Sequence, residues 1–260
     1  MLKKLLELYQ YQELVKILVS RNLKVRYRNS VLGYAWTWLD PLMMMFIFIL
    51  IFDVLFKSGI KHFPLYLLCG LIPWTFFQNT TGESVSSMTD NAGLIKRVYY
   101  PREIFPLTIM LTHGVTMSLS LMVLIPVVLA FGVPISAKIL LFPIITIFFF
   151  LFTFGLSLIF ATMNVFMRDI KHIVPLILKL WFYFTPIFYA AEKMMPERIL
   201  DIYMFVNPLA VVLTLFRSMF MNYDVPKPIH IAFALVECLL LFLLGYVFFK
   251  KNEDLMIKRI

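Results

Sequence analysis

The sequence predicts an all-α membrane protein with six transmembrane helices. Three observations predict this class: 61% of the 260 residues are hydrophobic, only 15% are charged, and apolar tracts recur between short hydrophilic segments. Soluble domains are about one quarter charged, and a helix needs about 20 apolar residues to cross a bilayer. We therefore divide the chain into an N-terminal segment, residues 1–32, and a six-span transmembrane domain, residues 33–260.

The N-terminal segment has apolar residues at near-helical spacing among seven lysines and arginines. This pattern predicts an amphipathic helix that lies in the membrane interface with its basic face toward lipid headgroups. An amphipathic helix packed on a soluble partner is the open alternative. The segment lacks the short apolar core and small-residue cleavage site of a signal peptide, so we expect the mature chain to keep it.

Six spans are predicted at about residues 34–56, 63–87, 104–131, 139–166, 173–189 and 231–249. Trp36 and Trp38 open the first one, as expected at a membrane interface. The second is the weakest, because its apolar part ends at Phe77 and is too short to cross a bilayer. Either the polar run from Gln78 to Ser87 continues this helix against protein or water, or the helix ends early.

Two further segments lie between the predicted spans. One is a short hydrophilic stretch after the second span, at about residues 90–100. The other, at about residues 193–222, contains the apolar piece NPLAVVLTLFR, which is too short to span. We expect this second segment to form short re-entrant or interfacial helices before the last span.

The distribution of charge predicts orientation. Most lysines and arginines fall on the side of the two termini, which the positive-inside rule places in the cytoplasm. The net charge of +9 comes from short clusters that flank apolar tracts. Such clusters are typical of contact with anionic lipid rather than with nucleic acid, so we expect no nucleic-acid partner.

The sequence carries no pattern for catalysis. No glycine is followed by lysine, which excludes a phosphate-binding P-loop. The four histidines are far apart, and Cys69 and Cys238 lie in apolar tracts, so we expect no metal site and no cofactor in this chain. The energy for any transport must come from a partner or from an ion gradient. Glu237, inside an apolar tract, keeps a proton-relay role as an alternative.

Four stretches resemble a known family. They are RNLKVRYRNSVLGYAW at residues 21–36, NAGLIKRVYYPREIFP at 91–106, FMRDIKHIVP at 166–175, and FTPIFY with NPLAVVLTLFR at 184–189 and 207–217. In this order they resemble the permeases of ABC type-2 exporters, in the branch that exports lipid-linked polysaccharides such as O-antigen, capsule and teichoic acid. The likeness covers most of the chain. Tyr100 stands where the family often has phenylalanine, which leaves the assignment intact.

The resemblance implies a homodimer in the cell inner membrane, joined to two copies of a separate cytoplasmic ABC ATPase that binds ATP and Mg. Residues 1–32 would be the interface helix, and residues 90–100 the main coupling helix. The coupling residues would be Leu94, Ile95, Lys96, Arg97, Arg168 and Asp169. A physical argument agrees: an apolar knob and two cations suit a groove lined by carboxylates, and Pro101 ends the helix. A plain basic loop is the alternative.

Aromatic residues gather at the outer end of the fifth span: Trp181, Tyr183, Phe184, Phe188 and Tyr189. Aromatic faces stack on sugar rings without fixed hydrogen bonds, which suits a conduit for a glycan. Lipid-facing bulk is the alternative reading for such residues. The resemblance implies that these aromatics and the re-entrant helices line the glycan path.

We therefore expect the permease subunit of an ATP-driven exporter that moves an undecaprenyl-pyrophosphate-linked, O-antigen-like polysaccharide across the cytoplasmic membrane. The basic residues Arg21, Lys24, Arg26 and Arg28 are candidates for docking the pyrophosphate, since clustered cations bind phosphates at a membrane surface. The alternatives are a permease for a small hydrophobic compound or another lipid-linked glycan, and a membrane scaffold that does not transport.

Overall fold

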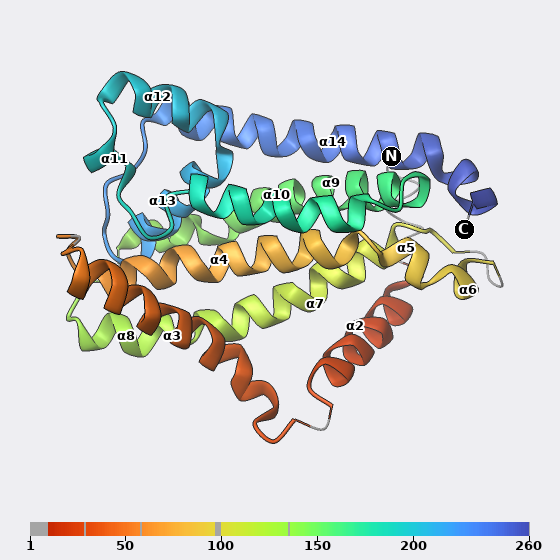
Figure 1. Cartoon of the computed structure of the whole chain (residues 1–260), viewed down its shortest axis with the longest axis horizontal. Helices are drawn as coiled ribbons and strands as arrows, with labels where there is room; N and C mark the ends of the chain where they lie inside the picture. The colour runs from red at the N-terminus through yellow and green to blue at the C-terminus, as the bar shows by residue number, and fades with distance from the viewer. Residues whose placement is uncertain (1–9, 29, 58, 97–99, 135, 260) are drawn as a thin grey trace.

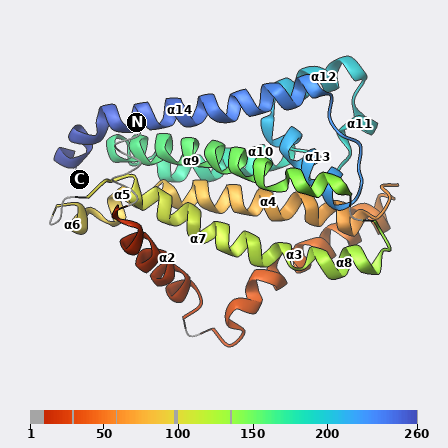
Figure 2. The ribbon, with the colours of Figure 1, turned by 180° about the vertical axis from the view of Figure 1, so that it is seen from behind.

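The computed structural model describes residues 10–28, 30–57, 59–96, 100–134 and 136–259, and the regular elements in these ranges are all helices. The predicted all-α class is confirmed. The long helices run roughly side by side along one axis of the molecule, and the short helices gather at the two ends (Figure 1). Seen from behind, the same order of long helices is evident (Figure 2).

Among the described residues, four helices are long and apolar enough to cross a membrane: Gly33–Leu55, Ile104–Ala130, Ala137–Phe166 and Pro228–Arg259. They match the predicted first, third, fourth and sixth spans. The first consists of η1 (Gly33–Ala35), α3 (Trp36–Phe48) and η2 (Ile49–Leu55). The predicted third span consists of α7 (Ile104–Leu121) and α8 (Leu124–Ala130), and the predicted fourth span of η3 (Ala137–Leu141) and α9 (Phe142–Phe166). The predicted sixth span is α14 (Pro228–Arg259).

The predicted second span is the central helix of the bundle. It is α4 (Phe63–Ser84), most of whose 22 residues are buried, and α5 (Ser87–Asp90) follows it directly. Thr80, Thr81 and Ser84 are fully buried, so the polar part continues the helix against protein, which was the first of the two alternatives. A helix enclosed by other helices does not need the apolar surface of a lipid-facing span. This explains why α4 is not among the four helices that are apolar enough to cross a membrane by themselves.

The predicted fifth span is shorter than expected. It is α10 (Ile170–Phe184), so the boundaries 173–189 are wrong at both ends. The helix stops because Thr185 precedes Pro186 and takes an extended conformation, as a residue before proline prefers. At 15 residues it is about 22 Å long, below the roughly 30 Å of a hydrocarbon core.

Three short helices precede the last one: α11 (Ala191–Met194), α12 (Glu197–Val206) and α13 (Pro208–Phe220). The axes of α12 and α13 meet at 104° across Asn207. The predicted short helical segment at 193–222 therefore exists. Most residues of α13 are buried, whereas α12 lies at the surface and has one buried residue, Met204.

The last helix is longer than predicted. The sequence analysis ended it at residue 249, but α14 continues through KKNEDLMIKR to Arg259. Neither glycine nor proline interrupts this run, and Lys250 pairs with Glu253 one turn later. The helix lies against α9, and the two backbones touch where Gly155 meets Gly245.

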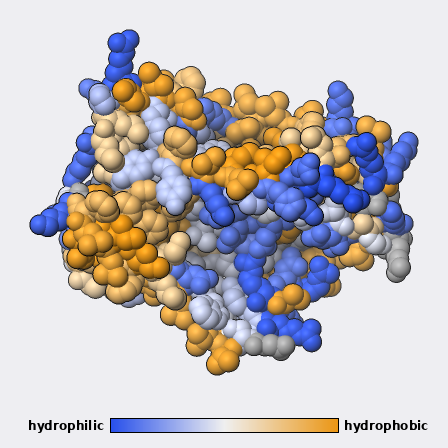
Figure 3. All heavy atoms as spheres, in the orientation of Figure 1, coloured by the Kyte–Doolittle hydropathy of each residue, from blue (hydrophilic) through white to orange (hydrophobic). Residues whose placement is uncertain are grey.

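The N-terminal segment contains α2 (Gln12–Arg26), which packs on α7. Together α2 and α3 form a V whose tip points away from the bundle (Figure 1). Residues 1–9 of the predicted interface helix lie outside the described part of the chain. Figure 3 shows apolar surface over α3 and more hydrophilic surface on the half that carries α2 and α5.

Candidate functional site

One end of the bundle carries the predicted coupling segment. α6 (Ala92–Ile95) lies there beside α5, near the end of α14 (Figure 1). Leu94 is 41% exposed, but Ile95 is only 4% exposed. The apolar knob that the sequence predicted is therefore Leu94 alone, because Ile95 packs inward. Lys96 is exposed, and Arg97 lies outside the described residues.

The chain just after this segment is bound to the last helix by ion pairs. Lys250 Nζ lies 2.6 Å from Glu103 Oε2 and 3.0 Å from Glu253 Oε2, and Arg102 Nη1 lies 3.4 Å from Glu253 Oε1. All four side chains are largely buried. Sequence reasoning missed this network, because its partners are about 150 residues apart and nothing local marks the pairing.

The second predicted coupling segment lies at the same end. Arg168 and Asp169 are exposed in the turn between α9 and α10. A cleft is lined by both Ala92 of α6 and Arg168 of this turn. The structure therefore brings the two predicted coupling segments together.

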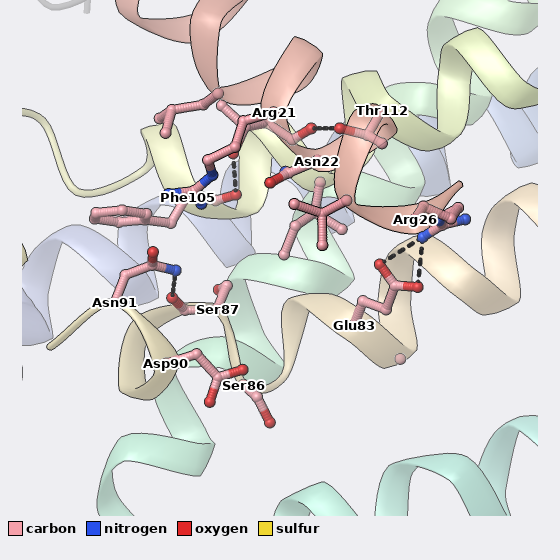
Figure 4. Close-up of a pocket in the computed structure, with 15 residues that line it drawn as sticks. Arg21, Asn22, Arg26, Glu83, Ser86, Ser87, Asp90, Asn91, Phe105 and Thr112 are labelled. Atoms are coloured by element: carbon pink, nitrogen blue, oxygen red, sulfur yellow. Dashed lines mark hydrogen bonds and ion pairs between the residues drawn. The ribbon is translucent and has the colours of Figure 1, made fainter. Parts of the chain in front are cut away.

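The fold divides the four predicted phosphate-docking cations, of which Figure 4 shows Arg21 and Arg26. Arg26 Nη2 donates to both carboxylate oxygens of Glu83, at 2.7 and 2.9 Å, and lies beside the buried ring of His113. Glu83 Oε2 is in turn 2.9 Å from His113 Nε2. Arg26 is thus occupied in joining α2 to α4 and α7, an arrangement that no sequence pattern indicated.

The other three cations line open spaces on either side of α2. Arg21 points toward a cleft of about 810 Å³ between α2, α4, α5 and α7, where Asp90 and Asn91 also lie (Figure 4). Arg21, Lys24 and Arg28 together line an outer groove of about 600 Å³ along α2. These three stay available to an anionic ligand.

The five predicted aromatics do not form one surface. Trp181 points inward: its Nε1 donates to Asn207 Oδ1 at 3.3 Å, and its ring meets Phe77 edge-on. Tyr183 and Phe184 are 65% and 68% exposed. Phe188 packs in a half-buried cluster with Phe48, Phe52 and Phe182, and the Tyr189 hydroxyl donates to the Phe184 carbonyl.

Two polar residues that the sequence analysis did not single out organise this region. Asn207, at the bend between α12 and α13, bonds Trp181 and, through Nδ2, Thr185 Oγ1 at 3.2 Å. Arg217, fully buried on α13, donates through Nη2 to the carbonyls of Pro186 and Ile187 at 2.6 and 3.0 Å. Both residues stood in the NPLAVVLTLFR stretch, but their partners could not be read from it.

Comparisons with known proteins find similar sequences over nearly the whole chain. The sequence model of the ABC-2 type transporter family matches residues 13–221. The chain is 32% identical to the O-antigen export system permease protein RfbA of Myxococcus xanthus, with 98% of each chain covered. It is 35% identical to a protein of the same name from Klebsiella pneumoniae, over 92% of each chain. The polysialic acid transport protein KpsM of Escherichia coli is 22% identical, over 94% of this chain and 95% of that protein.

Proposed function

Because the chain belongs to the ABC-2 type transporter family, we propose that it is the permease subunit of an ATP-driven exporter of an undecaprenyl-pyrophosphate-linked, O-antigen-like polysaccharide. The observation that carries the proposal is the similarity, over nearly the whole chain, to two proteins named as O-antigen export permeases. The sequence has no P-loop of its own, so a separate ABC ATPase would hydrolyse the ATP.

The proposed topology has six spans in the inner membrane, with both termini in the cytoplasm. The four candidate spans are completed by α4 and by α10 together with the residues that follow it, and both helices run alongside α9 and α14 in both views (Figures 1 and 2). The second subunit of a homodimer would cover part of the apolar surface that α10 and α3 leave exposed. Leu176 and Leu180 on α10 and Met43 on α3 belong to that surface.

Coupling to the ATPase is proposed at the end that carries α6. Leu94 and Lys96 are exposed there, and Arg168, next to the exposed Asp169, lines the same cleft as Ala92 of α6. Movement of this end would reach α14 through the ion pairs of Glu103 and Arg102 with Lys250 and Glu253. The tight packing of α14 on α9 would carry the movement into the bundle.

The substrate path is proposed along the exposed aromatic side chains Tyr183 and Phe184 of α10, with Trp181 holding the helix end in place. The pyrophosphate is proposed to dock on Arg21, Lys24 and Arg28. Arg26 leaves this set because Glu83 already binds it.

The test is a co-purification and export experiment with the cognate ATPase. We expect the double variant Leu94→Asp, Lys96→Glu to lose ATPase from the purified complex and to lose surface polysaccharide in cells. Met194→Asp changes an apolar, 70% exposed residue on α11 at the other end, and should leave both unchanged. Normal assembly and export by the double variant would remove α6 as the coupling element.

A second experiment distinguishes the alternative substrates and functions. ATP hydrolysis by the reconstituted complex should rise with lipid-linked polysaccharide. Stimulation only by small hydrophobic compounds would favour the drug-type permease, and no response to either would favour a scaffold. Loss of transport in Glu237→Gln with ATP hydrolysis intact would favour the proton-relay alternative.

A further inference from the structure

A small basic cleft lies at the end of the bundle that carries α6. Its volume is about 270 Å³, and it is separate from the larger cleft drawn in Figure 4. Elements distant in the sequence line it: α5 and α6, the end of α9, the start of α10 and the last turn of α14. The polar and charged lining residues are Thr89, Asn164, Arg168, Lys171 and Arg259.

The charge of this cleft is unbalanced. Three of the lining residues are cations and none is a carboxylate. In the part of the chain that the structure describes, neither Arg168 nor Lys171 forms an ion pair, even with the adjacent Asp169. Arg259 is held in place by its hydrogen bond to the Phe166 carbonyl at 3.4 Å. Like charges gathered around a small space repel one another, and an anion between them would offset that repulsion.

A buried amide in the wall of the cleft also lacks a partner. Asn164 is only 2% exposed, and its Oδ1 has no hydrogen-bond partner among the described residues. Buried polar atoms nearly always have one, so the amide leaves a hydrogen bond unmade on its oxygen side. An amide also carries two N–H donors, and because Asn164 lines the cleft, its amide nitrogen would be a donor to an anion bound there.

We propose that this cleft binds a phosphate group, from an anionic phospholipid headgroup or from a soluble phosphate compound. A phosphate carries up to two negative charges and presents acceptor oxygens in several directions. That matches cations and donors contributed from several sides, whereas a carboxylate offers one charge and two coplanar oxygens. Basic pockets between membrane helices on the cytoplasmic side bind lipid head groups in this way.

The volume of the cleft limits the size of the ligand that it can bind. Sites for small molecules have volumes of about 300–1,000 Å³, and this cleft lies just below that range. It fits the phosphate of a headgroup rather than a whole nucleotide. A bound phosphate would connect α5, the turn before α10 and the end of α14. The assignment to the inner leaflet rests on the orientation given under Proposed function, whereas phosphate binding itself does not.

The experiment uses the full-length protein, purified in detergent and stripped of lipid. The probes are phosphatidylglycerol, phosphatidylcholine and inorganic phosphate, with lipid retention measured by native mass spectrometry and phosphate binding by equilibrium dialysis. We expect phosphatidylglycerol to bind about tenfold more tightly than phosphatidylcholine if the source is a lipid. Binding of inorganic phosphate without any such lipid preference would assign the site to a soluble phosphate compound.

The variant Lys171→Gln, Arg259→Gln should weaken binding of the preferred probe about tenfold or more, because each hydrogen bond to a charged group contributes at least about that factor. Lys258→Gln removes an exposed cation from the same helix end outside the cleft, and should bind within about twofold of the parent chain. Arg259→Lys keeps the charge, so it should retain more binding than Arg259→Gln if charge rather than packing on Phe166 matters.

Two results would overturn the proposal. One is no binding of any probe by the parent chain. The other is equal probe binding by the parent chain and a monodisperse double variant. If that variant also loses the ATPase, the cleft is assigned to an acidic side chain of the partner. Loss of export with phosphate binding intact would count against the proposed function and leave the cleft assignment standing.

Discussion

The guanidinium carbon of Arg217 lies 3.5 Å from the centre of the Tyr66 ring, in the interior of the protein. Arg217 is fully buried, and carbonyl oxygens and the aromatic face surround its charge. These contacts join α13 to α4 and to the two residues after Thr185, where α10 has ended. The contacts of this buried cation therefore hold the bent α12–α13 pair against the bundle.

We expect Arg217→Met to destabilise the protein by about 2–5 kcal/mol, because the carbonyls of Pro186 and Ile187 would lose their donors while buried. The measurement is the thermal unfolding midpoint in detergent. Arg198→Met, at an exposed position on α12, is the control and should change the midpoint little. Equal midpoints for the two variants would show that the contacts of Arg217 contribute no stability.

The contact between α9 and α14 should not tolerate a methyl group. A Cβ on Gly155 would lie 2.5 Å from the Leu241 carbonyl oxygen, and one on Gly245 would meet the Gly155 carbonyl oxygen. We expect Gly245→Ala to destabilise the protein by about 1–3 kcal/mol, since overpacking forces the backbones apart.

The control for this prediction is Gly82→Ala, whose new methyl would make only an ordinary contact, 3.9 Å from Leu178 Cδ1. It should be neutral or stabilising by up to about 1 kcal/mol, because alanine favours a helix over glycine. If Gly245→Ala unfolds at the same temperature as Gly82→Ala, the two helices are not in backbone contact at this point.

The Arg26–Glu83 pair should attach α2 to the bundle. Arg26→Glu alone would place two carboxylates side by side, and we expect it to expose the chain between α2 and α3 to limited proteolysis. Adding Glu83→Arg should restore much of the protection, with a coupling energy of about 1 kcal/mol in a double-mutant cycle.

The matched control is the exchange of Glu13 and Lys16, a pair on the same helix whose side chains are both well exposed. Its coupling energy should be about 0.5 kcal/mol or less. A coupling as small as this for the Arg26–Glu83 exchange would indicate that other contacts hold α2 in place.

The exposed aromatics and Trp181, whose side chain points inward, should respond differently to replacement by leucine. Replacing both Tyr183 and Phe184 by leucine should lower export about tenfold with stability retained, because two stacking contacts of about 0.5–1.5 kcal/mol each are lost. Trp181→Leu should instead lower the unfolding midpoint, since its ring packs against Phe77 and its Nε1 bonds Asn207. Leu240→Ala, at an exposed position on α14, is the control for export.

This prediction tests whether Tyr183 and Phe184 line a glycan path or are ordinary lipid-facing side chains. If the double leucine variant exports normally, Tyr183 and Phe184 are ordinary lipid-facing residues and the path lies elsewhere. If it loses stability instead, the two side chains pack against a second subunit or another part of the assembly.

The sequence by itself determined the all-α class, the four longest apolar helices and the short helices before the last one. These features are local: hydrophobic tracts and proline positions are written in consecutive residues, and each acts within a few turns. The sequence also marked the stretches that resemble a transporter family. It could not decide whether the polar half of α4 stays helical, because that depends on what covers it.

Only the tertiary structure decided which polar groups meet. It paired Arg26 with Glu83, Glu103 with Lys250 and Arg217 with the carbonyls after α10, and it turned Ile95 inward while Leu94 stayed exposed. Each pairing joins elements far apart in the chain, and its geometry follows from how whole helices pack. A charge read from the sequence is therefore available for a ligand only where the fold has not already given it a partner, which is why Arg21 remains a docking candidate and Arg26 does not.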